Sequence, residues 1–212
     1  MAVGVDVGAK RLHVVALGIG GEVTNASVVA AADLADFESQ LAGLAENAVV
    51  AIDGPAGPSV AAYSDEAHLS EKFRLARGCE IELGRQRKIW VSFATGPHPL
   101  TGWMAVAQAI HNRVQAAGFR ALETYPHAVY ATLLGSRPPK KTSRAGLQER
   151  VRLLRAAGVD DPSLDSWSHD GLDAAAAALV ALHAYRGMAD AVTSPRDGTA
   201  IWLPGRNTLA TT

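Results

Sequence analysis

The sequence predicts an α/β fold in which helices flank a mixed β-sheet. Three short apolar runs with close connections open the chain, the pattern of an antiparallel meander. A helical stretch then leads to a fourth apolar run, and an intervening helix is how parallel strands are joined. The chain has 212 residues, 48% of them hydrophobic and 19% charged, which excludes disorder and suffices for one hydrophobic core. We therefore expect one domain over residues 1–203 and a flexible tail at 204–212.

The expected strands are apolar runs that end at turns, at residues 2–7, 12–17, 22–29, 49–52 and 119–123, with a further edge strand at 200–203. Helical spacing predicts helices at residues 34–44, 103–117, 126–134, 146–157 and 169–189. In the first of these, Asp33 can cap the helix. The stretch 64–100 contains a charged helix at 65–83 and a strand or loop at 89–93, and we expect it to form an insertion or lid.

Composition limits the partners of the chain. Lys and Arg number 20 and Asp and Glu 21, so no global charge attracts nucleic acid, and a polyanion must be bound by a local patch. Cys79 is the one cysteine and cannot form an intramolecular disulfide, which suits a reducing cytoplasm. The longest apolar run, 174–182, has nine residues, too few to cross a bilayer of roughly 30 Å. We expect a cytoplasmic protein without a membrane segment.

Carboxylates follow the predicted strands at the same edge of the sheet. Asp6, Asp53 and Glu123 lie at or just past the ends of three strands, and parallel strands place such ends on one side, where ligands bind. Asp170 and Asp173 are three residues apart at the start of the last long helix and so share a face. Small alanines further along this helix would let its start lie close to the sheet. Several carboxylates would then converge on one small volume.

Such a cluster needs a counter-charge. Two like charges about 4 Å apart repel by roughly 4 kcal/mol at an effective dielectric constant of 20. Oxygen ligands without nearby cysteine or paired histidine favour Mg²⁺ or Mn²⁺, and two such ions can hold the attacking water and the leaving oxygen of a phosphodiester. We therefore assign catalytic roles to Asp6, Asp53, Glu123 and Asp173. The predicted metal ligands are Asp6, Asp53, Asp170 and Asp173.

Four segments carry a family resemblance: Gly4-Val5-Asp6-Val7-Gly8-Ala9-Lys10-Arg11, Ala51-Ile52-Asp53-Gly54-Pro55, Glu123-Thr124-Tyr125-Pro126-His127 and His169-Asp170-Gly171-Leu172-Asp173-Ala174-Ala175-Ala176. In this order they resemble the domain-of-unknown-function family 429, whose members are predicted nucleases of the ribonuclease H fold. The resemblance spans nearly the whole chain. It implies a five-stranded sheet whose first three strands are antiparallel, with Asp6 and Asp53 on adjacent central strands. The helical acid pair also resembles that of Holliday-junction resolvases, which generally act as dimers, so a homodimer is a candidate assembly.

Each assignment has a plainer alternative. Asp6 and Asp53 are followed by glycine and would also suit turns, and Glu123 could pair with an arginine. Asp170 would suit the N-terminal end of a helix dipole, which explains Asp173 less well. Arg137, Lys140, Lys141 and Arg144 form a compact basic cluster that could bind substrate phosphates, although a solvated loop is the commoner explanation for such a run.

Three functions compete. The leading hypothesis is a divalent-metal-dependent nuclease that hydrolyses phosphodiester bonds of nucleic acid. A non-catalytic nucleic-acid- or protein-binding module of the same fold is the alternative. A nucleotide phosphotransferase is a third, since residues 4–8 also resemble the phosphate-binding start of actin-like ATPases, but those proteins need two such lobes. The sequence leaves open whether a substrate is DNA or RNA, and whether it is single-stranded, duplex or branched.

Overall fold

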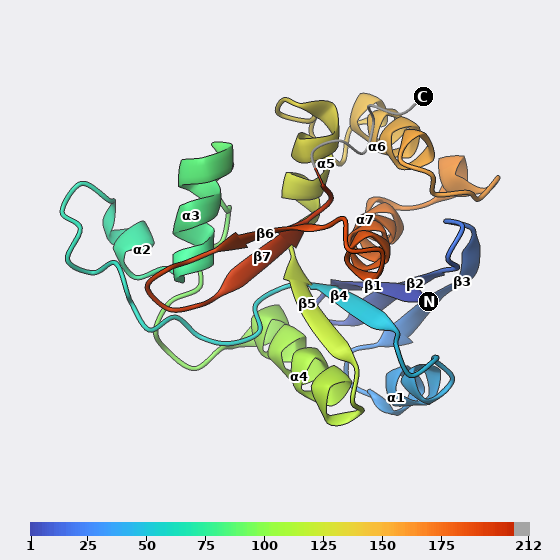
Figure 1. Cartoon of the computed structure of the whole chain (residues 1–212), viewed down its shortest axis with the longest axis horizontal. Coiled ribbons are helices and arrows are strands. Elements are labelled where there is room, and N and C mark those ends of the chain that lie inside the picture. The colour runs from blue at the N-terminus through green and yellow to red at the C-terminus, as the bar shows by residue number, and fades with distance from the viewer. Residues whose placement is uncertain (206–212) are drawn as a thin grey trace.

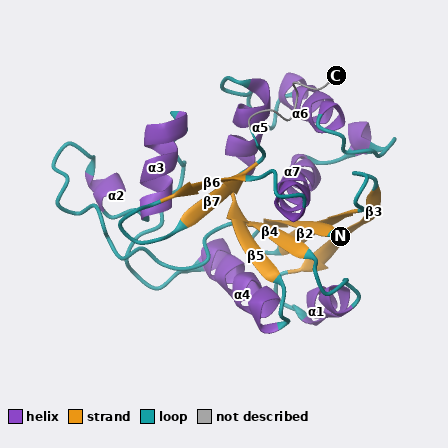
Figure 2. Cartoon of the chain, in the orientation of Figure 1, coloured by secondary structure: helices purple, strands orange, loops and turns teal. Residues whose placement is uncertain are grey.

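A computed structural model describes residues 1–205 and contains one mixed sheet with helices on both faces (Figures 1 and 2). The strands are β1 (Ala2–Val7), β2 (Arg11–Leu17), β3 (Val23–Ala30), β4 (Val49–Asp53), β5 (Arg120–Thr124), β6 (Asp190–Thr193) and β7 (Ala200–Leu203). The helices are α1 (Ala35–Ala42), α2 (Glu71–Arg74), α3 (Gly78–Arg87), α4 (Gly102–Ala116), α5 (Pro126–Leu134), α6 (Arg144–Ala156) and α7 (His169–Tyr185), with a short 3₁₀ turn at Leu164–Ser166.

The first five strands form a ribonuclease H-like core. In the sheet order β3-β2-β1-β4-β5, β2 runs antiparallel to both of its neighbours, while β4 is parallel to β1 and β5 is parallel to β4. The antiparallel meander and the parallel fourth strand are therefore confirmed. β1 and β4 are adjacent at the centre of this core, which places their carboxyl ends side by side.

The sheet has seven strands within residues 1–205, so the expected count of five is wrong. The two additional strands, β7 and β6, extend the sheet beyond β5 (Figure 1). Residues 200–203 do form a strand, but β7 lies between β5 and β6 and is not at the edge. The edge strand is β6, with four residues of which only Val192 is buried. Its segment, Asp190-Ala191-Val192-Thr193, has only two adjacent apolar residues, so no apolar run predicted a strand after the expected helix at 169–189.

The stretch 64–100 contains two short helices, α2 and α3, in place of the predicted charged helix at 65–83, and residues 89–93 form a loop, one of the two expected forms. α3 packs against β6 and β7 at one end of the sheet, where Figure 1 shows it. Cys79 and Leu83 of α3 are fully buried in the same core as α7. This segment is thus continuous with the main core, and its role as an insertion or lid stays a prediction.

The two faces of the sheet bury different helices. α7 and α5 lie on one face, and α4 and α1 on the other (Figure 2). Because strand residues alternate between faces, Val3, Val5 and Val7 point toward α4 and α1, whereas Gly4 and Asp6 point toward α7. This alternation decides which carboxylates can meet α7.

α7 lies unusually close to β1 because both elements present minimal side chains. A Cβ added at Gly4 would lie 2.1 Å from the carbonyl oxygen of Ala174 and from the amide nitrogen of Ala178. Ala174 to Ala178 are all fully buried. Only glycine on the strand and alanine on the helix permit this approach, which brings the first turns of α7 to the end of β1.

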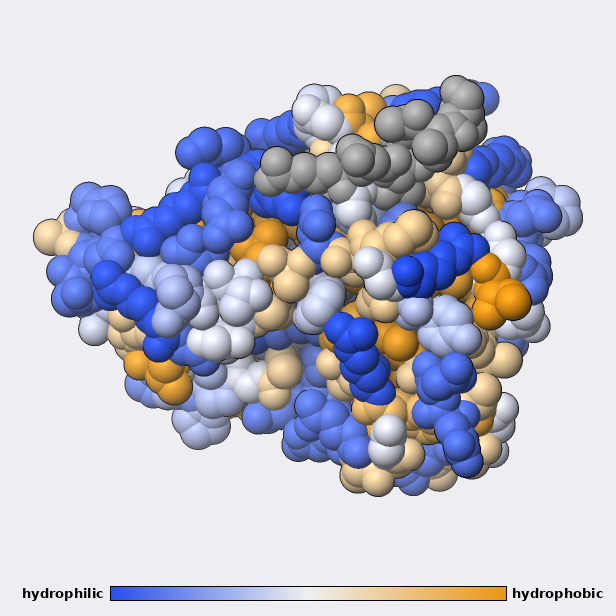
Figure 3. Space-filling model, viewed as in Figure 1, coloured by the Kyte–Doolittle hydropathy of each residue, from blue (hydrophilic) through white to orange (hydrophobic). Residues whose placement is uncertain are grey.

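The surface shown in Figure 3 carries small apolar patches scattered among polar side chains. In the part of the chain that the structure describes, no helix has the length and apolar character needed to traverse a bilayer. Of the predicted flexible tail, Pro204 and Gly205 are described and follow β7, and residues 206–212 lie outside the described residues.

Candidate active site

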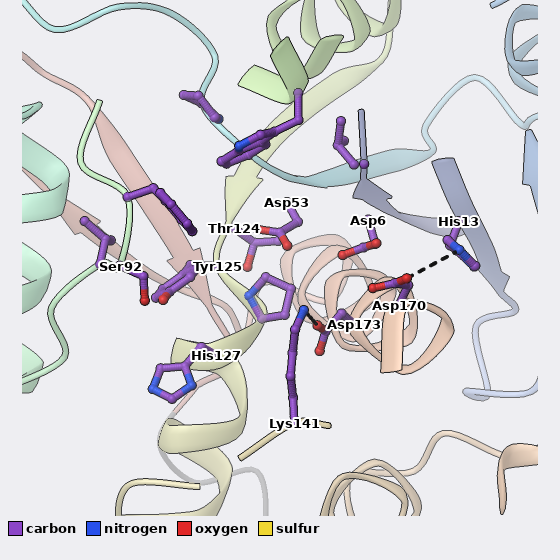
Figure 4. Close-up of a pocket in the computed structure, with 18 of the residues that line it drawn as sticks. Asp6, His13, Asp53, Ser92, Thr124, Tyr125, His127, Lys141, Asp170 and Asp173 are labelled. Carbon is purple, nitrogen blue, oxygen red and sulfur yellow. Dashed lines mark hydrogen bonds and ion pairs between the residues drawn. The ribbon is translucent and has the colours of Figure 1, made fainter. Parts of the chain in front are cut away.

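Asp6 and Asp53 form the centre of the site. The two residues are register partners at the ends of β1 and β4, and neighbouring strands lie about 4.8 Å apart. Both therefore point toward α7, and Figure 4 shows their carboxylates side by side. Asp6 is only 7% exposed. The structure thus brings together the two acids that the sequence analysis placed on adjacent strands.

The start of α7 supplies two further carboxylates. Ser168 caps the helix, its hydroxyl oxygen accepting the Gly171 amide hydrogen at 3.2 Å. One turn in, Asp173 is buried and directs its carboxylate to Lys141, whereas Asp170 is 40% exposed and lies 3.9 Å from Nε2 of His13 (Figure 4). Asp173 is therefore the inner acid of the helical pair, and Asp170 lies at the rim.

The carboxylates are electrostatically unsatisfied. Burial, and to a smaller extent repulsion from Asp173 and Asp170, raises the pKa of Asp6 to about 7. Burial is also the main cause that raises the pKa of Asp53 well above its ordinary value, and repulsion from Asp6 and Asp173 adds to it. A group whose charged form is disfavoured to this degree favours either a proton or a cation beside it.

Two cationic side chains reach Asp173. Lys141 Nζ donates to Asp173 Oδ2 at 3.0 Å, and Arg150 Nε lies 3.7 Å from Oδ1. At that distance Oδ1 accepts no hydrogen bond from Arg150, and this buried oxygen has no other hydrogen-bond donor among the described residues. Arg150 also donates to the carbonyl oxygens of Gly146 and Pro139, so it fixes the loop that carries Lys141.

Arg150 is a site residue that the sequence analysis missed. The predicted helix places Leu147, Val151 and Leu154 inward, and Arg150 lies on that same face. A charge on an inward face needs a partner, because a buried unpaired ion is costly. That signal was present in the sequence, although it could not reveal that the partner is Asp173.

Glu123 is not brought to the aspartates. It is paired across the sheet with Ile52, whereas its neighbour Thr124 is paired with Asp53, so Glu123 points to the opposite face. There Arg77 donates to both of its carboxylate oxygens, to Oε2 at 2.6 Å, and the Ala56 amide donates to Oε2 at 3.1 Å. The pairing with an arginine, considered above as the plainer alternative, is what the structure shows.

Arg77 is held by a second acid. Its backbone amide donates to Glu80 Oε2 at 3.2 Å, and the Thr95 hydroxyl donates to Glu80 Oε1 at 2.7 Å. Arg77 and Glu80 are each 3% exposed. This buried network ties α3 to the end of β5 and, through Ala56, to the turn that follows Asp53.

A cleft of about 1240 Å³ opens over the aspartates. The cations among its lining residues are Lys10, Arg11, Arg77, Arg137, Lys140, Lys141 and Arg150. Four of these, Lys10, Arg11, Arg137 and Lys140, are exposed and form no ion pair within residues 1–205. Of the predicted substrate-binding residues, Lys140 and Lys141 therefore line the cleft, whereas Arg144 begins α6 and lies outside its lining.

The donor set fits a hard divalent cation chemically, but its geometry is not closed. Asp6 and Asp53 offer carboxylate oxygens without a cationic hydrogen-bond donor, and Asp173 Oδ1 accepts no hydrogen bond. Among residues 1–205, however, no three or more His, Cys, Asp or Glu side chains are arranged to hold a metal ion. Lys141 already engages Asp173, so a cation here requires Asp173 to turn toward Asp6.

The fold and the site define an α/β protein whose mixed sheet carries a cleft with aspartates at its floor. Residues 4–197 match the model of the family described as "Protein of unknown function (DUF429)", and the chain belongs to that family. A search of curated proteins found no match.

Two solved structures are similar over almost the whole chain. The first, described as "Thermus thermophilus RuvC structure", is 18% identical, with 95% of this chain and 98% of that chain covered and a TM-score of 0.42. The second, "T. thermophilus RuvC in complex with Holliday junction substrate", is 17% identical, with 96% and 100% covered and a TM-score of 0.41.

Proposed function

We propose that the protein is a divalent-metal-dependent nuclease that hydrolyses phosphodiester bonds of nucleic acid. The observation that carries this proposal is the set of aspartates at the floor of a cleft rimmed by exposed cations, with Asp6 and Asp173 buried and Asp53 half-buried. An anionic floor alone would repel a phosphate. A cationic rim alone would only bind one.

The acids have the donor chemistry that Mg²⁺ or Mn²⁺ prefers. Asp6 and Asp53 would hold the cation, with Asp173 and Asp170 completing the site. When bound, such a cation supplies Lewis-acid activation of the phosphodiester and of the attacking water. The raised pKa values of Asp6 and Asp53 support this role, because a cation between the carboxylates would offset both the burial and the repulsion that raise them.

Side chains around the acids would bind and position the substrate. Lys10 and Arg11 in the β1–β2 turn and Arg137 and Lys140 in the α5–α6 loop would contact backbone phosphates. Glu123, to which the sequence assigns a catalytic role, would instead position the turn after Asp53 through the Ala56 amide.

One observation favours the alternative, a non-catalytic nucleic-acid-binding module. The Lys141 ammonium already neutralises part of the charge on Asp173 without any metal ion. If this pair persisted in the presence of Mg²⁺, the cleft would retain its cationic rim and could bind phosphates without cleaving them. A cytoplasmic location and a homodimer also stay predictions.

Cleavage of fluorescently labelled single-stranded, duplex and branched oligonucleotides in Mg²⁺, Mn²⁺ or EDTA tests the proposal. We expect cleavage that requires the divalent cation and falls at least about 100-fold in Asp53→Asn, because the substitution removes one charged ligand without changing its shape. The matched control is Asp33→Asn, an exposed aspartate outside the cleft. Binding of every substrate without cleavage in either cation would favour the binding module.

A further inference from the structure

Phe93 is an exposed aromatic side chain on the wall of the candidate active site. Its side chain is 69% exposed, a position that costs hydrophobic free energy. Among the large hydrophobic side chains that are exposed in residues 1–205, it is the one that lines the cleft. Trp90, by contrast, lies outside the cleft lining and packs on Phe73, with ring centroids 4.6 Å apart.

A second ring supports Phe93. Trp103, at the start of α4, is half-buried, lines the same cleft and lies edge-on to Phe93, with ring centroids 6.5 Å apart and an interplanar angle of 75°. This T-shaped arrangement is a favoured geometry for aromatic pairs. A T-shaped contact covers at most one face of the Phe93 ring, and because Phe93 is 69% exposed, a face stays available to a flat partner.

The aromatic pair is fixed to the backbone that follows Asp53. A Cβ built on Gly54 would lie 3.2 Å from Cζ3 of Trp103 and 2.6 Å from Cβ of Ala107, so the Gly54 backbone lies directly against the indole ring. Gly54 also has φ +147°, which L side chains rarely adopt. The position of Trp103 is therefore coupled to that of Asp53, one residue away.

Charge and shape together indicate the occupant. The cleft that contains Phe93 also contains the four exposed cations without ion-pair partners, so its ligand carries negative charge as well as a flat apolar group. Phosphates and bases of nucleic acid have this combination. In a duplex the base faces are covered by their neighbours, so a side-chain ring can stack only on an unpaired base.

We propose that Phe93, supported by Trp103, is a stacking platform for an unpaired nucleobase of a single-stranded segment bound in the cleft. One phosphate of that segment would lie near Asp53, and the exposed cations at the rim of the cleft would bind the neighbouring phosphates. This inference rests on the proposed function, and it names the class of substrate as nucleic acid with unpaired bases. In Figure 4, Ser92 lies on the opposite side of Asp53 from Asp170 and His13. Phe93 directly follows Ser92 in the chain.

Fluorescence anisotropy of the full chain in EDTA, where no cleavage occurs, tests the platform. The probes are an oligothymidylate of about 20 nucleotides, an abasic strand of the same length and charge, and a blunt duplex. We expect the wild-type protein to bind oligothymidylate most tightly. Phe93→Ala should weaken that binding about fivefold to 100-fold, the range of one base–aromatic contact, and leave the affinity for the abasic strand unchanged.

Two matched variants sharpen the result. Phe93→Trp should retain tight binding, because it keeps the ring, and Tyr185→Ala, an exposed aromatic outside the cleft, should bind like the wild type. Equal affinities of Phe93→Ala and wild type for oligothymidylate would overturn the platform and leave the nuclease proposal standing. An equal loss on the abasic strand, or preferential binding of the duplex, would also overturn it. Failure of the wild type to bind any probe would overturn the platform, and the cleavage assay in Mg²⁺ or Mn²⁺ would then decide the proposed function separately.

Discussion

Asp6 is buried with a carboxyl group whose charged form is disfavoured, and this has a measurable consequence for stability. Its pKa is raised from an ordinary 3.8 to about 7, so the folded state binds more protons than the unfolded state between these values. The free energy of unfolding should therefore fall as pH rises from about 4 to about 7. Asp53 shifts in the same direction and adds to the effect.

Thermal melts at pH 5 and pH 8 in EDTA measure this dependence. We expect the melting temperature of the wild type to be lower at pH 8 than at pH 5. Asp6→Asn should raise the free energy of unfolding at pH 8 by about 1–3 kcal/mol. Mg²⁺ should stabilise the wild type more at pH 8 than at pH 5 and should barely affect Asp6→Asn. A variant less stable than the wild type at pH 8 would show that Asp6 is a structural residue.

Lys141 competes for the position that a cation would take. Its ammonium group hydrogen-bonds Asp173, so it repels a divalent ion and occupies one of the predicted ligands. Lys141→Met should tighten Mn²⁺ binding several-fold in isothermal titration calorimetry. Lys140→Met, a neighbouring lysine without an ion pair, should not change it. Weaker Mn²⁺ binding in Lys141→Met would instead make the lysine an organiser of the site.

At the scale of elements, the contact between β1 and α7 sets the position of the helical acids. Gly4→Ala would force a methyl group into the backbone of Ala174 and Ala178, and α7 would have to move away from the sheet. We expect a loss of about 1–3 kcal/mol of stability by chemical denaturation, as for other overpacked cores. Gly43→Ala is the matched control, because its Cβ would meet only the Gln40 carbonyl at an ordinary 3.6 Å. An equal, small effect of both substitutions would contradict this account of the packing.

The buried pair of Arg77 and Glu123 connects α3 with β5. Glu123→Ala should destabilise the protein by about 3–5 kcal/mol, because it leaves the Arg77 guanidinium buried without its main partner. Urea denaturation of Glu123→Ala, Arg77→Met and the double variant measures the coupling between the two residues. Strictly additive effects of the two substitutions on the free energy of unfolding would exclude this coupling. Glu123→Gln that folds normally but has lost all cleavage would restore a catalytic role for Glu123.

The same elements show how far sequence patterning reaches. The strands that end in Asp6 and Asp53 were predictable, because each is a continuous apolar run that stops at a carboxylate. The direction of Glu123 was predictable in principle, since strand alternation puts it and Thr124 on opposite faces. Its partner Arg77 was not, because the two are 46 residues apart and meet only through the tertiary fold. β6 was not predicted, because a four-residue strand without an apolar run has no recognisable sequence pattern.

At the scale of the whole molecule, the ribonuclease H-like core places strand ends, a helix start and a basic loop around one cleft. The sequence predicted which acids would converge there, with Glu123 as the exception. It did not indicate that Lys141 and Arg150 would face Asp173, since the path of a loop is set by packing and not by a periodic pattern. The cationic rim explains how a chain with nearly balanced charge could still bind a polyanion, through a local patch.

Anomalous scattering from crystals soaked in Mn²⁺ shows whether Asp6, Asp53 and Asp173 bind a metal ion. Manganese accepts oxygen ligands as Mg²⁺ does and gives an anomalous signal that Mg²⁺ lacks. We expect one or two Mn²⁺ ions bound by Asp6 and Asp53, with Asp173 turned from Lys141 toward the ion. An absence of anomalous signal at these carboxylates, with Lys141 still on Asp173, would contradict a metal-dependent nuclease and leave a nucleic-acid-binding module.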